Sequence, residues 1–265
     1  MKFAIDISIG RTSTYGSFIG NGQTEVTKVN TKPDDLLTGL VHCINEGAGK
    51  YGLPAREMLM QTDTLKLSTF VATDVVNRKK GPKLGLIMTK GFKNGLYEAK
   101  IGTPISNLIL SNMIEEIEEE VDSFGNQTNP PREEEVKSVV RHLLERGVQN
   151  IVVSLHRSWL NPANEERIRV IIRQDYPAHY MGAMPIFLST EVSTTQQDYV
   201  KRTSMTLLNA YLQKAMANHL REVAEALREL GYNKPLLIVN SDGEATTLAK
   251  TMASDIYSLS AAKRS

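Results

Sequence analysis

The stretch FAIDISIGRTSTYGSFIGNGQ, residues 3–23, decides the fold. Apolar and polar residues alternate along residues 3–9 and again along 15–19, and this alternation predicts two β-strands. A Gly-Arg-Thr-Ser corner at 10–13 separates the strands, and a Gly-Asn-Gly turn at 20–22 ends the second one. The chain is therefore expected to open with a β-hairpin.

The hairpin corner carries residue types that suit a magnesium-phosphate site. Asp6 lies in the apolar first strand, and Gly10, Thr12 and Ser13 follow it at the corner. A carboxylate can orient waters bound to Mg²⁺, while backbone N–H groups and hydroxyls hold phosphate oxygens. The alternative is that Gly10 is an ordinary turn residue and that Asp6 caps the backbone. The residues alone leave both interpretations open.

Strands and helices alternate after the hairpin, which predicts an α/β fold. Further strands are expected at 24–30, 65–71, 85–89, 150–155, 186–189 and 235–239. Helices are expected from about residue 34 to 44 and at 72–79, 107–121, 133–146, 161–174 and 203–230. The last helix has an apolar stripe at three- and four-residue intervals, so it either crosses the back of a domain or offers a surface to a partner.

Other polar stretches are weaker candidates for a site. Hydroxyls at 68–74 surround a strand-to-helix passage, where they serve either an anion or simple capping. His156 follows a strand and is either a general base or metal ligand, or a packed, hydrogen-bonded side chain. Asp242 is expected in a turn after the strand at 235–239, where it serves either a phosphate or substrate contact or the turn itself. The basic turn at 78–83 and the glutamate run at 115–120 are expected to be solvated.

Composition excludes several classes of function. The formal net charge is +1, which gives no electrostatic reason to expect a nucleic-acid partner or binding to a membrane. One cysteine, Cys43, excludes an internal disulfide and fits a reducing compartment. No stretch reads as a signal peptide, a membrane span or a local metal-ligand motif, so a cytoplasmic protein is expected.

Several segments together resemble the hydantoinase A/5-oxoprolinase family, which includes the ATP-dependent ketone carboxylases. The segments are the opening hairpin, 69–74 with GPKLGLIMTKGF at 81–92, LHRSWLNPANEERI at 155–168, STEVSTTQQDYVKRTSMTLLNAYL at 189–212, and NSDG at 240–243. The resemblance implies an actin-like (ribonuclease-H-like) N-terminal module. It also implies a hydantoinase/oxoprolinase-like domain at 1–185 and the start of a second α/β module at 186–265.

The chain departs from the family pattern at the phosphate corner. That corner usually reads DxGGTxTD in the family, whereas here Ser8 and Ile9 replace the glycine pair and Ser13 stands in place of an aspartate. The chain also ends at Ser265, before the family's second phosphate hairpin. In-line phosphoryl transfer needs both phosphate grips. We therefore expect an incomplete ATPase fold that is a poor ATPase by itself.

The resemblance implies a subunit of a multi-subunit ketone carboxylase, a ligase that forms C–C bonds. Within the family, the chain most resembles a small (epsilon-type) subunit of acetophenone-carboxylase complexes. Such a chain would complete or regulate ATP-driven activation of a ketone or lactam by larger hydantoinase A/B-like partners. Candidate Mg-ATP contacts are Asp6, Gly10, Thr12, Ser13 and Asp242. The alternative is a non-catalytic interaction protein that uses the helix at 203–230 for docking.

Overall fold

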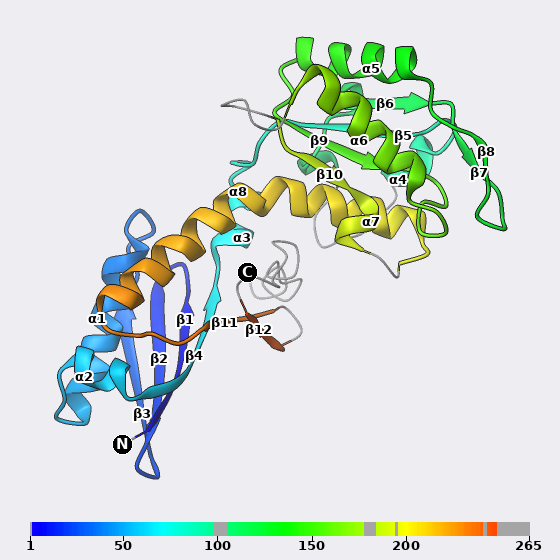
Figure 1. The fold of residues 1–265 in the computed structure, drawn as a ribbon. Helices are drawn as coiled ribbons and strands as arrows, with labels where there is room; N and C mark the ends of the chain where they lie inside the picture. The colour runs from blue at the N-terminus through cyan, green and yellow to red at the C-terminus, as the bar shows by residue number, and fades with distance from the viewer. Residues whose placement is uncertain (1, 98–104, 178–183, 194–195, 241–242, 248–265) are drawn as a thin grey trace. The chain divides into compact units, whose positions relative to one another are not determined.

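The chain folds into two compact units (Figure 1). The computed structural model describes residues 2–97, 105–177, 184–193, 196–240 and 243–247. Unit 1 combines Met1–Asp74 with Ala215–Ser265, and unit 2 is Val75–Lys214. Unit 2 is thus an insertion in the sequence of unit 1. The predicted domain boundary between residues 185 and 186 differs from these unit boundaries. It concerns the modules implied by the family resemblance and stays a prediction.

Unit 1 is built on a mixed sheet with the order β12-β11-β4-β1-β2-β3. Its strands are β1 Phe3–Ile9, β2 Ser13–Gly20, β3 Gln23–Asn30, β4 Thr62–Thr69, β11 Leu236–Val239 and β12 Ala245–Thr247. The first three strands pair antiparallel, as the opening hairpin predicts. Strand β4 then joins β1 in parallel, and β11 joins β4 in parallel. This is the arrangement expected of a ribonuclease-H-like module.

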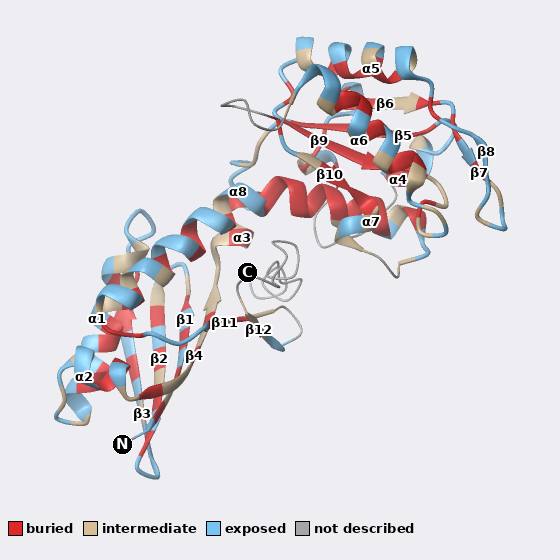
Figure 2. Cartoon of the chain, viewed as in Figure 1, coloured by how far each residue is buried: buried red, intermediate tan, exposed pale blue. Residues whose placement is uncertain are grey.

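Helix α1, Leu36–Lys50, covers one face of the unit 1 sheet against β2 and β3. Asp35 caps its first turn by accepting a hydrogen bond from the Thr38 amide at 3.1 Å. Its buried side includes Leu40, Cys43 and Ile44, while the opposite side is exposed (Figure 2). A second short helix in unit 1 is α2, Ala55–Met60. One face of the sheet is thus closed by apolar packing.

Two glycines of α1 give a matched test of this packing. A Cβ atom on Gly47 would lie 2.3 Å from the ring of the fully buried Phe18, whereas a Cβ on Gly49 would meet no atom within 4 Å. We expect Gly47→Ala to lower the free energy of unfolding by about 1–3 kcal/mol through overpacking. Gly49→Ala should raise it by up to about 1 kcal/mol, because alanine favours helix. Denaturant titration measures the change in the free energy of unfolding for each variant. Equal changes in the two variants would contradict the close packing of α1 on β2.

Unit 2 is built on a parallel sheet with the order β10-β9-β5-β6. Its strands are β5 Leu84–Thr89, β6 Ile114–Ile117, β9 Asn150–Ser154 and β10 Ile186–Leu188. Its other described elements are α3 Val71–Asn77 at the junction with unit 1, α4 Lys93–Leu96, η1 Ile105–Asn107, η2 Ser111–Met113, the hairpin of β7 Glu120–Val121 and β8 Gln127–Asn129, α5 Glu133–Glu145, α6 Ala163–Asp175 and α7 Ser189–Val192. Every residue of β5 and β9 is buried, because helices cover both faces of the sheet (Figure 2).

Helix α8, Tyr199–Glu229, contributes to the cores of both units. In unit 2 it covers the face of β9 that carries Asn150 and Ser154, whose side chains bond to Ala210 and Thr203 of α8. Helices α5 and α6 lie on the opposite face (Figure 1). In unit 1 the helix buries an apolar stripe that consists of Met216, Leu220, Val223 and Leu227. The predicted long helix is therefore confirmed, and most of its stripe is core.

The helix predicted at 107–121 is wrong. The segment contains two short 3-10 turns, strand β6 and the start of the β7–β8 hairpin. Glutamates favour helix locally, but Ile114 and Ile117 are buried when the segment pairs with the open edge of β5. Tertiary pairing thus outweighs local propensity. Residues 126–131 likewise contain β8, which pairs with β7.

Candidate functional site

The face of the unit 1 sheet opposite to α1 is polar at its centre. Along β1 the isoleucines point to the buried face, so Asp6 and Ser8 point to the open one. Lys66 lies beside Asp6 on β4, and Ser68 lies beside Ser8. Two rows of polar side chains therefore run across β1 and β4.

These rows line a cavity of about 370 Å³ within unit 1. Its lining residues are Asp6, Ile7, Ser8, Tyr15, Gly16, Ser17, Val26, Lys66, Ser68, Val239 and Gly243. Asp6 is thus the predicted site residue that faces the cavity. Its carboxylate lies 3.9 Å from the ammonium of Lys66, and about half of its side chain is exposed. A carboxylate this accessible can bind the water shell of a cation.

Gly10, Thr12 and Ser13 form a tight corner at the end of the hairpin. The Gly10 amide donates to the Ser13 carbonyl at 3.0 Å, and the Thr31 amide donates to the Thr12 carbonyl at 2.9 Å. A Cβ on Gly10 would lie 2.7 Å from the Ser13 oxygen, so the corner requires glycine there. Asp6 and Gly10 are separated by roughly 13 Å of extended strand. The corner therefore adjoins the cavity without lining it.

The corner offers hydrogen-bond donors suited to an anion. Within the described residues, the backbone amides of Arg11 and Thr12 have no hydrogen-bond partner. The hydroxyls of Thr12 and Ser13 and the charge of Arg11 lie on the same turn. Free amides and hydroxyls of this kind hold phosphate oxygens. The residues present thus fit a polyphosphate at the corner, whereas Asp6, roughly 13 Å away along the strand, fits a hydrated Mg²⁺ in the cavity.

The substituted glycine pair alters the corner in a defined way. Strand β1 continues through Ile9, which pairs with Thr14 and is almost completely buried. The backbone at Ser8 and Ile9 is therefore occupied by strand pairing, and the turn begins only at Gly10. The donors available to an anion are consequently those after residue 10.

A second polar segment adjoins the corner. The Phe70 amide donates to the Ile9 carbonyl at 3.0 Å, which places the passage from β4 to α3 next to the hairpin end. There the Thr69 hydroxyl bonds to Nε2 of His219 at 3.1 Å, and the Val71 amide donates to the same hydroxyl at 3.4 Å. Burial lowers the pKa of His219 to about 4, so its imidazole is neutral at neutral pH. The predicted hydroxyl segment and the corner thus lie together.

Sequence reasoning missed Lys66 and His219. Lys66 had a usable signal, because it alternates with the apolar residues Leu65 and Leu67 of a strand that must pair with β1. His219 falls beside Leu220 on the apolar stripe of α8, which marks it as buried. Asp242, the remaining predicted contact, lies outside the described residues, although Gly243 lines the cavity.

The other candidates lie in unit 2. Lys83 of the basic turn donates to the Arg146 carbonyl, so this ammonium is held by the protein itself. His156 lies just beyond β9, where its ring stacks on Phe92 with centroids 4.1 Å apart. No group of three or more His, Cys, Asp or Glu residues in the described part of the chain is placed to hold a metal.

Comparison with known proteins gives the family. Residues 2–176 match the family model described as "Hydantoinase/oxoprolinase N-terminal region". The chain belongs to the hydantoinase/oxoprolinase family. It is 32% identical over 271 residues to the acetophenone carboxylase gamma subunit of Aromatoleum aromaticum, a match that covers 96% of this chain and 37% of that subunit. It is 25% identical to the acetone carboxylase beta subunit of Xanthobacter autotrophicus, with 94% and 38% covered.

A solved structure confirms the fold of this hydantoinase/oxoprolinase chain. The nucleotide-free structure of acetone carboxylase, an ATP-dependent enzyme, superposes with a TM-score of 0.82 at 25% identity. The match covers 97% of this chain and 38% of that one. The chain is therefore homologous to subunits of ketone carboxylases and spans less than two fifths of these relatives. The narrower resemblance to a small subunit stays a prediction.

Among the described helices, none has both the length and the apolarity needed to cross a bilayer.

Proposed function

We propose that unit 1 binds the phosphates of a magnesium nucleotide at the hairpin corner and the adjoining cavity. The observation that carries this proposal is that the amides of Arg11 and Thr12 have no partner among the described residues, in the same unit as the open face that presents Asp6. Gly10 permits the turn, Thr12 and Ser13 supply hydroxyls, and Asp6 orients the waters of Mg²⁺. Asp242, which lies outside the described residues, remains a proposed contact. Bound ATP would supply the phosphoryl group that activates a carbonyl oxygen.

In an assembly, the chain would act as part of an ATP-dependent ketone carboxylase. We propose that it completes or regulates the activation of a ketone or lactam by larger hydantoinase A/B-like subunits in the cytoplasm. Support comes from its homology to the acetophenone and acetone carboxylase subunits. The C–C bond-forming ligase activity belongs to the complex in this proposal. Phosphoryl transfer needs the phosphate grips and the metal held together, and unit 1 supplies one grip.

Calorimetry with Mg-ATP tests the nucleotide proposal. Asp6→Ala should weaken binding at least about tenfold, because a carboxylate that orients metal waters makes charge-assisted hydrogen bonds. Asp34→Ala is the matched control, since Asp34 is an exposed carboxylate of the same unit outside the cavity, and it should leave the Kd unchanged. If the wild type and Asp6→Ala bind Mg-ATP with equal affinity, Asp6 does not contact the magnesium nucleotide.

The alternative is a non-catalytic interaction protein built on the same fold. It is favoured by the strand pairing at Ser8 and Ile9 and by the Lys66 ammonium beside Asp6, both of which reduce what the corner offers to a metal-bound phosphate. In that case the wild-type chain shows no Mg-ATP binding at millimolar nucleotide. A partner bound through the exposed side of α8 is then the expected function.

A further inference from the structure

The carboxyl edge of the unit 2 sheet has the topology of a ligand site. From β5 the chain proceeds to β6 on one side, whereas from β9 it proceeds to β10 on the other side. The connections that leave β5 and β9 therefore diverge, and ligands of open parallel sheets bind in the crevice at such a switch point. Thr89 ends β5, and His156 lies two residues beyond β9.

A cavity of about 410 Å³ occupies this position. Thr89, Phe92, His156 and Arg157 line it, and the His156 amide donates to the Thr89 hydroxyl at 2.7 Å, which ties the two strand ends together. Phe92 keeps 36% of its surface exposed although it is a large apolar side chain. The cavity thus combines an accessible aromatic ring with polar groups, as small-molecule sites do.

The imidazole ring of His156 contacts two aromatic rings. Phe92 stacks on the ring with an interplanar angle of 23°, and Tyr199 meets it edge-on with centroids 5.9 Å apart. Within the described residues, neither ring nitrogen makes a hydrogen bond. Burial, followed by the charges of Arg157 and Arg202, lowers the pKa of His156. The neutral ring has one donor and one acceptor for a ligand.

Arg157 supplies the positive charge of the cavity. Its φ of +60° lies in the left-handed region, which non-glycine residues seldom adopt and which concentrates at functional sites. Its guanidinium gives one hydrogen bond to the Val121 carbonyl at 3.1 Å, and no other partner is found among the described residues. Several N–H donors of this planar group therefore remain for a ligand.

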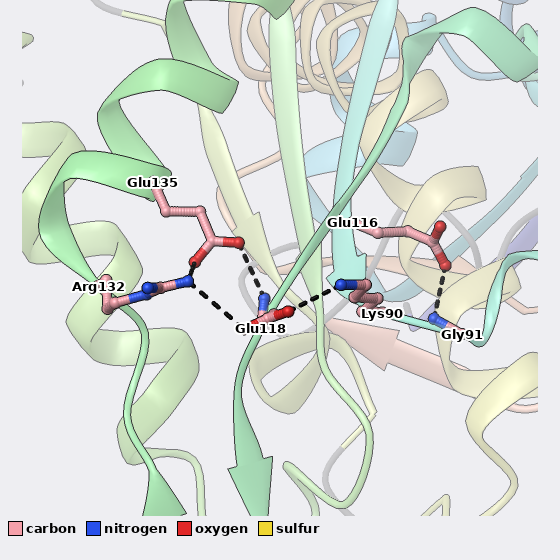
Figure 3. Close-up of polar contacts among 6 residues, drawn as sticks. All are labelled: Lys90, Gly91, Glu116, Glu118, Arg132 and Glu135. Atoms are coloured by element: carbon pink, nitrogen blue, oxygen red, sulfur yellow. Dashed lines mark hydrogen bonds and ion pairs between the residues drawn. The ribbon is translucent and has the colours of Figure 1, made fainter.

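The acidic side chains near the cavity are largely compensated (Figure 3). Glu118 accepts from the Lys90 ammonium at 2.7 Å and lies 3.4 Å from Arg132, while Glu135 holds the Glu118 amide at 3.1 Å. Glu119 accepts hydrogen bonds from Thr89 and Asn164, and burial raises the pKa of its carboxyl group, which disfavours the charged form. Among the charged residues that line the cavity, Arg157 is then the cation without an ion-pair partner in the described part of the chain, and the exposed Glu120 limits the negative charge that a ligand can carry.

A buried network fixes the backbone that carries His156 and Arg157. The Arg202 guanidinium donates to the Leu155 carbonyl at 2.6 Å, and Glu165 accepts from the Leu155 amide at 2.9 Å. Ser189 joins the two, because its hydroxyl donates to Glu165 and accepts from Arg202. Buried charged groups contribute little net stability, whereas they hold geometry well when fully hydrogen-bonded. The end of β9 is thus positioned in advance.

We propose that this cavity binds a small organic monocarboxylate. Its carboxylate would accept hydrogen bonds from Arg157 and His156, and its carbon skeleton would lie against Phe92. The site is independent of the nucleotide site proposed for unit 1. The planar fork of arginine suits a carboxylate, and the neighbouring glutamates disfavour a phosphate dianion.

Acetate, butyrate and benzoate serve as probes in calorimetry with the full chain without nucleotide. We expect at least one to bind at millimolar concentration and Arg157→Gly to weaken it by about tenfold to a hundredfold, the loss of a charged hydrogen bond. Glycine also relieves the left-handed backbone, so the variant should fold. His156→Phe keeps the stack on Phe92 and removes the ring nitrogens; it should weaken binding too. Arg141→Ala, an exposed arginine of α5, is the control and should bind like the wild type.

Three results would overturn the proposal. The first is that none of the three acids binds to the wild type. The second is that Arg157→Gly binds as tightly as Arg141→Ala. The third is that inorganic phosphate or neutral benzamide displaces the acid at equal concentration, since either would show that the site does not select a monocarboxylate.

Discussion

Replacing Arg202 by methionine is expected to destabilise unit 2 by about 3–5 kcal/mol. Arg202 is fully buried and donates to Ser189, Gln196 and Leu155. Methionine keeps much of the volume but leaves the buried Glu165 without its nearby cation. Leaving a buried charge without a nearby opposite charge costs far more than the intact network contributes. The expected loss is therefore large although the pair itself adds little.

The fluorescence of Trp159 measures this effect. It is the single tryptophan of the chain and lies in unit 2. Lys201→Met is the matched control, because Lys201 is exposed on the preceding position of α8 and should change stability by less than about 0.5 kcal/mol. Adding Glu165→Gln to Arg202→Met should cost less than the sum of the two single changes. Strict additivity would show that the two side chains do not act as a pair.

Acidification should destabilise unit 1 through His219. The pKa of this buried imidazole is about 4, below its ordinary value of 6.5. Between those values the unfolded chain binds a proton that the folded chain does not, so stability is lost as the pH falls from about 6.5 towards 4. At pH 4.5 the loss amounts to about 2–3 kcal/mol relative to pH 7.

His219→Gln separates this effect from the titration of carboxylates. Glutamine offers a polar atom to the Thr69 hydroxyl and does not titrate. The stability of the His219→Gln variant should therefore fall less on acidification than that of the wild type. Amide exchange in β4, corrected for the intrinsic rate at each pH, reports on unit 1 because β4 is central to its sheet. If the wild type and the His219→Gln variant lose the same stability on acidification, His219 is not the source of the loss.

Local patterns predicted the opening hairpin and the long helix because each depends on a periodicity within one segment. The alternation along residues 3–9 gave β1, and the stripe from Met216 to Leu227 gave the buried face of α8. The helix predicted at 107–121 was wrong because the structure of this segment depends on pairing with the edge of β5, which no local pattern reveals. The pairing of β11 with β4 was hidden for the same reason, since the whole of unit 2 separates them in sequence.

The candidate site was predictable only in part. Asp6 and the corner residues stand in one short stretch, so their types were enough to mark them. The partners that define their surroundings, Lys66 and His219, come from β4 and α8 and reach the hairpin only through tertiary packing. The role of Arg157 depends on a left-handed φ, for which the sequence holds no turn signature.

The insertion of unit 2 has a consequence for synthesis on the ribosome. Strand β4 ends at Thr69, and its neighbour β11 begins at Leu236, so residues 70–235 are translated in between. At typical elongation rates this takes about 10–30 s, during which the β4 edge of the nascent sheet lacks its native neighbour. Contiguous residues 75–214 can fold meanwhile. The emerging chain would therefore depend on chaperones that shield an open strand edge until β11 has left the exit tunnel.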